Sequence, residues 1–561
     1  MRPRGGARGA AAVVLGVALA PLGALVAAAC VDRGPDGSVR PALFPAALAA
    51  LDPWVWDGAR NSLVMAVAVT AAARVVGVGA ARLATRRRFW GRRPLGALAC
   101  VGLAAPPAFA AIGLRGVLPG FMAGLAGPAV WERVGVGPEL AAAWLAWFWA
   151  TLAWSAPLVG LSAASALGRV ETAWVDAARL AGAGPRRAWR QLVWPAVRPD
   201  VARALGAVFT LALLEPGAPL VLGLRRTLGH QIAQAALSAA DPGQLSRAAV
   251  LALGGMALAA AGRLLIDGWG GAKVRPDGVR SVSLNPMQAV PFGPAVGSVM
   301  LLGALALLAV SPLAATAWRA SGFRVTDYDS TLRRIVLNSA ALGLAVLAVD
   351  LLLARVSSSL TGRLGGLVAW ADLATPLAVG VGVIALPDVL AMAAEACSRS
   401  ALGPALTRPV VVALLRLAEI VSPAGTPGVA VVIGAALVRL PLAARAAAEG
   451  RSGVRPGLVD AAVVLGASEG RARARLAGGW LGVPAGPAVL TWAFATTCLT
   501  PAFLLEPTNR TAGPAVIALA ARADGACLAA ALATAAVALN LVGLVAAARG
   551  RFGGGAVRPA A

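Results

Sequence analysis

Residues 175–199 read VDAARLAGAGPRRAWRQLVWPAVRP, a polar segment in a chain of 561 residues that is otherwise rich in Ala, Val, Leu and Gly. The segment contains an acid, two alanines directly after it, a glycine six residues after the acid, an apolar residue ten further on and a proline three beyond that. A carboxylate pairs well with a guanidinium of another protein, and small alanines allow another backbone to approach closely. The pattern predicts a protein-docking surface formed by Asp176, Ala177, Ala178, Gly182, Leu192 and Pro195.

Two short helices would position these side chains. Residues 169–181 can form an amphipathic helix, Gly182 suits the left-handed conformation that ends a helix, and Pro185 suits the first turn of the next. We expect Pro195 to end that second helix before the chain re-enters the membrane. The alternative interpretation is an amphipathic elbow that only lies in the lipid interface.

The second helix is expected to present an apolar ridge with a basic border. At helical spacing its large apolar residues fall on one face, and its arginines cover the others. A partner protein could bind this ridge and the acid of the first helix at the same time. The ridge consists of Trp189, Leu192 and Val193, and the border of Arg186, Arg187 and Arg190.

Composition places the chain in a membrane. Hydrophobic residues make up 59% of it and charged residues 13%, and the mean hydropathy is +0.76, far from the usage of a soluble domain. The formal net charge of +25 comes mainly from arginines between long apolar runs. Because no base-stacking aromatic residues accompany them, we expect no nucleic-acid partner, and the bias instead matches the Lys/Arg-rich cytoplasmic loops of membrane proteins.

The sequence predicts no catalytic and no metal site. Its five cysteines are scattered through apolar segments without CxxC spacing, and His230 is its one histidine. Neither paired carboxylates nor a nucleophile–base arrangement stands out, and no GxxxxGK[ST] loop is present to hold nucleotide phosphates. We therefore expect a protein that is not an enzyme and that binds no cofactor itself.

About twelve apolar runs are long enough to cross a bilayer, which requires about 20 residues each. With the N-terminus inside, the inner loops hold 28 Lys/Arg in 135 residues and the outer loops 14 in 137, so we expect both termini in the cytoplasm. The first run also has the features of a secretory signal before Cys30, but a matching run at 291–317 favours a retained helix. The runs are 9–30, 60–84, 95–118, 138–165, 199–222, 246–266, 291–317, 335–354, 364–396, 427–444, 485–506 and 526–547.

The two halves of the chain are similar in sequence. The segment beginning NSLVMAVAV at Asn61 corresponds to NSAALGLAV at Asn338, an offset of 277, and DAARLAG at Asp176 corresponds to DAAVVLG at Asp460, an offset of 284. This similarity predicts a tandem duplication of a six-helix unit. The expected units are 1–275, with a core at about 57–266, and 276–561, with a core at about 334–548.

The second copy of the docking segment is less complete than the first. It has Gly478 and Gly479 where the first copy has Trp194 and Pro195, so we expect it to dock more loosely. Its docking residues are Asp460, Ala461, Ala462, Gly466 and Leu476.

The segment resembles the cytoplasmic-loop signature E-A-A-x3-G-x9-I-x-L-P of the permeases of binding-protein-dependent ABC importers. Two fused permease units, together with RRRFWGRR, LAAPPAFAAIGLRGVL and LLEPGAPLVLG, are similar to the iron(III), thiamine and polyamine or phosphonate group. Both copies depart from the signature by having Asp in place of Glu, which shortens the reach of the carboxylate.

The resemblance implies an all-α polytopic protein of the inner membrane with about twelve helices in two type I importer units. Such a permease forms the translocation pathway and docks through its two loops onto two cytoplasmic ATPase subunits, expected here as a homodimer, which use the ATP. A substrate-binding protein delivers the substrate, of the iron(III) or thiamine class, to the opposite face.

Charge within a predicted membrane run is costly and often functional, and four of the charged residues in these runs are candidates for a functional role. Arg74 and Asp350 differ by one residue in repeat register, so an ion pair between the halves is one interpretation. The other is that each charge is neutralised locally or by water. Glu215 and Asp372 are candidates for the translocation path.

A twelve-helix secondary transporter is the alternative function, because it also duplicates six helices and has a basic loop like TRRRFWGRRP. That loop lacks the expected acid here, and a secondary transporter gives no reason for docking segments after the fourth and tenth runs.

Overall fold

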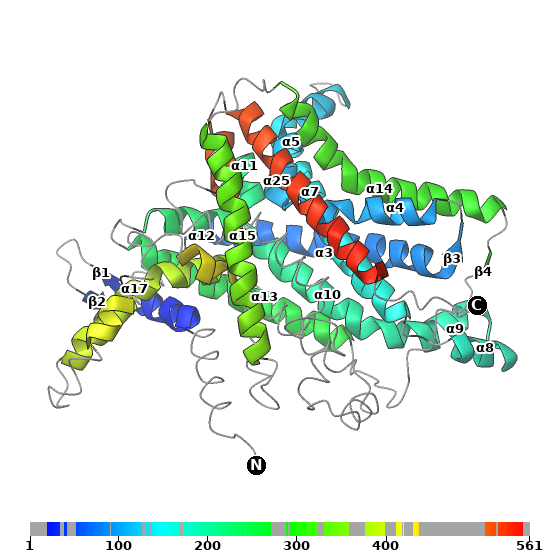
Figure 1. The fold of residues 1–561 in the computed structure, drawn as a ribbon, viewed down its shortest axis with the longest axis horizontal. Helices are drawn as coiled ribbons and strands as arrows, with labels where there is room; N and C mark the ends of the chain where they lie inside the picture. The colour runs from blue at the N-terminus through cyan, green and yellow to red at the C-terminus, as the bar shows by residue number, and fades with distance from the viewer. Residues whose placement is uncertain are drawn as a thin grey trace, which may run out of the picture.

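The computed structural model describes residues 20–33, 39–41, 52–89, 91–125, 131, 133, 136–168, 170, 172–239, 241, 243–270, 288–289, 292–322, 330–357, 376–398, 411–417, 419, 430–436, 511–522 and 525–553. These residues are almost entirely helical (Figure 1). Seven helices among them are long and apolar enough to cross a membrane, which is consistent with a polytopic membrane protein. The predicted run 485–506 lies outside the described residues.

The described helices follow one another with few other elements. Two very short strand pairs occur, β1 (Val31–Arg33) antiparallel to β2 (Val39–Pro41) and β3 (Arg87–Arg88) parallel to β4 (Gln288–Ala289). The helices of the first half are α3 (Pro53–Arg86), α4 (Arg92–Ala99), η1 (Val101–Ala104), α5 (Pro107–Leu125), α7 (Pro138–Gly168), α8 (Thr172–Leu180), α9 (Pro185–Ala188), η2 (Trp189–Val193), α10 (Trp194–Leu214), α11 (Gly217–Leu222), α12 (Leu228–Leu237) and α13 (Gln244–Gly270). Those of the second half are α14 (Phe292–Ala320), α15 (Ser330–Ser357), α17 (Pro376–Ser398), α24 (Ala512–Ala520) and α25 (Ala526–Gly553).

Prolines break two of the predicted runs. The run 95–118 is divided into α4, η1 and α5, because Ala105 before Pro106 takes an extended conformation with φ −113° and ψ 111°. The run 199–222 is divided into α10 and α11, because Glu215 before Pro216 is also extended, with ψ 114°. A residue that precedes proline is driven out of the helical conformation by the proline ring.

Small residues bring the helices of the first half into backbone contact. A Cβ atom at Gly77 of α3 would lie 2.7 Å from the carbonyl oxygen of Ala156 and 2.9 Å from the nitrogen of Gly160, both in α7. Membrane helices associate through such small residues, since lipid offers no hydrophobic driving force between helices. The α3–α7 contact therefore forms the centre of the first half, with α10 packed against both helices.

Helix α14, the first of the second half, packs on the first half. It contacts α4, α5 and α7, and also α25. The hydroxyl of Thr316 donates a hydrogen bond to the carbonyl of Phe109 in α5, at 3.2 Å. A Cβ atom at Gly113 would overlap the backbone nitrogen of Thr316, so the two helices touch at this glycine.

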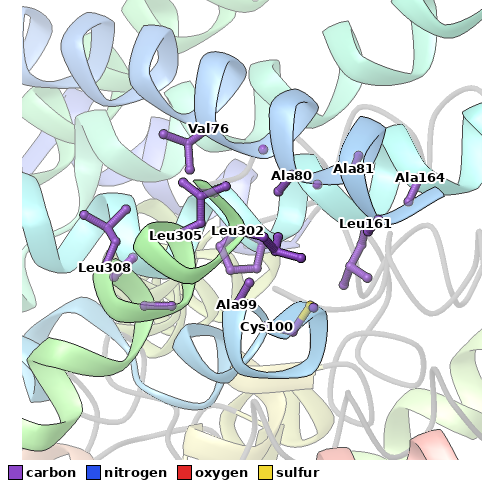
Figure 2. A pocket seen from close by; sticks show the side chains of 18 of the residues that line it. Val76, Ala80, Ala81, Ala99, Cys100, Leu161, Ala164, Leu302, Leu305 and Leu308 are labelled. Atoms are coloured by element: carbon purple, nitrogen blue, oxygen red, sulfur yellow. The ribbon is translucent and has the colours of Figure 1, made fainter. Parts of the chain in front are cut away.

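An apolar cavity of about 270 Å³ lies between α3, α4, α7 and α14 (Figure 2). Alanines, glycines and leucines make up most of its lining, including Leu302, Leu305 and Leu308 of α14. Arg92 is the one charged residue among the described lining residues, and its guanidinium donates to the carbonyl of Ala84 at 3.1 Å. The cavity has the chemistry to hold apolar groups.

We expect the Gly113→Ala variant to unfold at lower temperature than the wild type, because the added methyl group forces α5 away from α14. Overpacking of this kind costs about 1–3 kcal/mol. The matched control is Gly120→Ala in the same helix, where a Cβ atom would meet nothing within 4 Å. Thermal unfolding of both variants in detergent, followed by circular dichroism, measures the difference. Equal midpoints for the two variants would contradict the close contact.

Candidate protein-docking site

The segment after α7 forms a bent pair of helices. Gly182 takes the left-handed conformation with φ +82°, as the sequence predicts, and the N–H of Ala183 donates to the carbonyl of Ala178 at 2.9 Å, which ends α8. Gly184 is extended, with φ −62° and ψ 161°, and Pro185 begins α9. The predictions for Gly182 and Pro185 are confirmed, because both follow from local backbone preferences.

The second helix of the pair does not end at Pro195, and that prediction is wrong. α9, the π-helical segment η2 and α10 follow one another without a break from Pro185 to Leu214. Pro195 lies in the first turn of α10, directly after η2. The π-helical turn is wider than an α-helical turn and precedes Pro195, which has no backbone N–H to donate. The helix therefore continues past this proline.

The apolar ridge faces the protein itself, which corrects the expectation that it is offered to a partner. Val193 is buried, and Trp189 and Leu192 are half-buried against the core. The Arg82 guanidinium of α3 lies over the Trp189 ring at 4.5 Å from its centroid. Hydrophobic periodicity identified the apolar face but could not show which neighbour covers it.

A cluster of three tryptophans and three arginines, which we call the Arg–Trp cluster, fixes this helix to α3 and α13. The rings of Trp189 and Trp194 are stacked with centroids 6.3 Å apart, and the centroids of Trp194 and Trp269 are 5.9 Å apart. Arg74 lies 4.6 Å from the Trp269 centroid and 5.7 Å from that of Trp194. Such contacts contribute about 0.5–2 kcal/mol each. Its members are Trp189, Trp194, Trp269, Arg74, Arg82 and Arg198.

The outer surface of the helix pair remains open. Asp176, Ala177, Gly182 and Pro195 are exposed, whereas Ala178 and Leu192 are half-buried. Leu180 is 91% exposed and adds an apolar contact that the sequence pattern did not single out. The arginines of the basic border, Arg186, Arg187 and Arg190, are exposed as well. In Figure 1, α8 and α9 lie at one end of the molecule, far from α12.

Of the four charged residues selected in the predicted membrane runs, Arg74 and Glu215 have a local partner in the structure. Arg74 lies on the rings of the Arg–Trp cluster. The carboxylate of Glu215 accepts the N–H groups of Gly217 at 2.9 Å and of Ala218 at 3.0 Å, and so caps the start of α11. Asp350 belongs to α15, and Asp372 lies outside the described residues, as do the second-copy residues Asp460, Ala461, Ala462, Gly466 and Leu476.

One kind of hydrogen bond occurs twice, at two places that the predicted repeat would make equivalent. The N–H of Leu228, which begins α12, donates to the hydroxyl of Ser62 at 2.9 Å. The N–H of Ala512, which begins α24, donates to the hydroxyl of Ser339 at 2.7 Å. These serines follow Asn61 and Asn338, so they are 277 residues apart, and the two donors are 284 apart. Both spacings equal the offsets of the sequence repeat, although the sequence alone did not single out this contact.

His230, at the start of α12, is partly buried, and its Nδ1 has no hydrogen-bond partner among the described residues. Burial, together with the positive charge of Arg225, lowers the pKa of His230 below its ordinary value of 6.5. The folded protein therefore binds fewer protons here than the unfolded chain. The contribution of His230 to the free energy of unfolding therefore rises as the pH increases from the pKa of His230 in the folded protein up to 6.5.

We expect the wild type to lose stability when the pH falls from about 7.5 to about 5.5, because protonation of His230 favours the unfolded chain. The His230→Gln variant should lose much of this dependence. Thermal midpoints of both proteins across this range give the answer. A variant with the same pH slope as the wild type would show that other groups cause the dependence.

Within the described part of the chain, no group of three His, Cys, Asp or Glu side chains could hold a metal ion. No family model matches the chain, and comparisons with curated proteins and with solved structures find no match. The function proposed below therefore depends on the sequence pattern and on the geometry of the docking segment.

Proposed function

We propose that the chain is the transmembrane permease subunit of an ATP-driven ABC importer, located in the inner membrane with both termini in the cytoplasm. The observation that carries the proposal is the bent pair α8–α9, which presents an exposed acid, an exposed leucine and three exposed arginines at one end of a bundle of apolar helices. Cytoplasmic ATPase subunits dock on this pair and on its second copy.

The way in which the pair is mounted supports a coupling role. A loop that only lay on the membrane surface would need no fixed connection to the core. Here η2 continues directly into α10, and the Arg–Trp cluster joins it to α3 and α13. Movement of a docked subunit is therefore transmitted to the three membrane helices α3, α10 and α13. Because the docked subunits act on both halves of the chain, they shift the equilibrium between two arrangements of the helices, and such a shift is what coupling requires.

The two hydrogen bonds to Ser62 and Ser339 support an architecture of two six-helix units, with the first at 1–275 and the second at 276–561. A hydrogen bond that recurs at the repeat offsets is expected when both halves share one fold. In this proposal the two halves together enclose the pathway, a binding protein delivers the substrate from outside, and the partner subunits use the ATP. The substrate belongs to the iron(III) or thiamine class by resemblance alone.

The test is purification of the tagged full chain from native membranes under mild detergent, followed by ATPase assays. We expect an ATPase subunit with a phosphate-binding loop to copurify in a stoichiometric complex, and we expect the separated chain to hydrolyse no ATP. ATP hydrolysis by the chain alone would contradict the proposal. Transport by the chain alone, driven by an ion gradient in vesicles, would identify a secondary transporter instead.

A further inference from the structure

We propose that Arg115, Arg319 and Arg522 form a binding site for a phosphate-type oxyanion at the junction of the two halves. The three side chains line one cavity of about 220 Å³, although they are far apart in the sequence. Arg115 belongs to α5 of the first half, Arg319 to α14, and Arg522 follows α24. The other described lining residues are Ile112, Val221, Ala520, Ala521 and Ala526.

The charges of the three guanidinium groups are only partly compensated. Nη1 of Arg115 donates to the carbonyls of Val221, at 2.8 Å, and Ala520, at 3.3 Å. Nη1 of Arg319 donates to the carbonyl of Ile112 at 2.9 Å. Carbonyl groups orient a guanidinium but carry no net charge, and no carboxylate lines the cavity among the described residues. The described lining of the cavity therefore carries three positive charges and no negative one.

The side chain of Arg522 has donors that no described residue uses. It is exposed, and its side chain makes no hydrogen bond or ion pair with another described residue. Each guanidinium has five N–H donors in a planar fork, and the described residues accept only a minority of the donors of the three arginines. Three guanidinium forks that line one cavity fit the several oxygens of one oxyanion better than they fit a spherical ion.

Size limits the ligand to a small group. The cavity volume of about 220 Å³ is several times the roughly 30 Å³ that one water occupies in the liquid. An inorganic phosphate, or a phosphate group at the end of a larger molecule, fits there with some of its water. The phosphate of a phospholipid headgroup has the same chemistry as the free ion, so both are sources of this ligand.

Gly116 leaves room for the side chain of Arg319. A Cβ atom at this glycine would lie 3.2 Å from Cδ, Nε and Cζ of Arg319, so the guanidinium rests against bare helix backbone. A larger residue at position 116 would displace Arg319 without changing any charge. Ligand binding at the site can therefore be weakened by a change in side-chain size as well as by a change in charge.

Binding of the anion does not depend on the proposed function, whereas a role of the anion as transported substrate would depend on it. The cavity lies against α5, α11 and α24, which are far from α8 and α9 in Figure 1. A permease with this site at its outer end would favour an anionic substrate, such as an anion-bound metal, over a free cation.

The experiment is calorimetric titration of inorganic phosphate into the purified full chain in neutral detergent at constant ionic strength. We expect Arg522→Gln and Gly116→Val each to raise the Kd by about tenfold or more, since each loses charge-assisted hydrogen bonds. Arg333→Gln is the matched control, because Arg333 is exposed on α15 and does not line the cavity. It should bind as the wild type does.

Native mass spectrometry of the same samples distinguishes the two sources. Phosphate binding to the wild type that is weakened in Arg522→Gln identifies a free anion. A phospholipid retained by the wild type and lost from Arg522→Gln identifies a headgroup. If neither ligand binds, or if Arg522→Gln and Arg333→Gln behave alike, the proposal is overturned, while copurification of an ATPase subunit would still support the permease.

Discussion

Replacing Gly182 with serine is expected to weaken the complex with the ATPase subunit by roughly 5- to 30-fold. The left-handed conformation at Gly182, with φ +82°, costs an L-residue about 1–2 kcal/mol, and that cost corresponds to this change in affinity. The bend between α8 and α9 then opens, and Asp176 and Leu180 no longer face the partner together. Affinity measured with purified subunits, or ATPase stimulation at fixed subunit concentration, gives the size of the loss.

Gly184→Ser is the matched control, because it introduces the same side chain two residues away. Gly184 is extended and precedes α9, a position at which serine is favoured, and neither glycine has a neighbouring atom within 4 Å of its Cβ direction. We expect Gly184→Ser to bind the ATPase subunit normally. Equal losses in the two variants would show that the surface, and not the bend, determines docking.

Replacing Trp269 with leucine is expected to destabilise the chain by about 2–4 kcal/mol. The ring contacts Trp194, Arg74 and Arg198, and an aromatic pair with two cation–π contacts sums to about this value. Because the Arg–Trp cluster connects the docking helix to α13, we also expect ATP hydrolysis by the complex to be coupled less tightly to transport. Equilibrium unfolding by circular dichroism and transport per ATP measure the two effects.

Trp56→Leu is the control for the loss of a tryptophan, since Trp56 is 63% exposed. A double-mutant cycle of Arg74→Gln with Trp269→Leu isolates the energy of that cation–π contact. Additive effects in the cycle would show that Arg74 and Trp269 act independently, and would remove the cluster from the coupling route.

The sequence predicted those features that depend on neighbouring residues. Gly182 and Pro185 have backbone preferences strong enough to determine the bend, and the long apolar runs predicted membrane helices over α3, α7, α13 and α14. The prediction that the helix ends at Pro195 was wrong, because the π-helical segment before this proline depends on the whole helix and not on the neighbouring residues alone. The direction of the ridge at Trp189 was missed because it depends on α3, which is about a hundred residues away in the chain.

Features built from distant residues had no signal in the sequence. Ser62 and Ser339 are single hydroxyls in apolar helices, and only their donors in α12 and α24 give them a role. Arg115, Arg319 and Arg522 share neither a motif nor a spacing, and they meet because α14 and α24 pack near α5. Glu215 was selected as a candidate for the translocation path, but its contact with the start of α11 could not be predicted, because it depends on the break at Pro216.

The packing of α14 on α4 and α5 has a consequence for the order of biosynthesis. The helices of the first half are synthesised first, but the surface of α5 around Gly113 is covered only when α14 follows, and roughly 170 residues separate Leu125 from Phe292. At about 5–20 residues per second, that surface faces lipid or an insertion factor for about 10–30 seconds. A nascent chain stalled within this interval should therefore crosslink to a chaperone through α5, and a chain stalled after α14 should not.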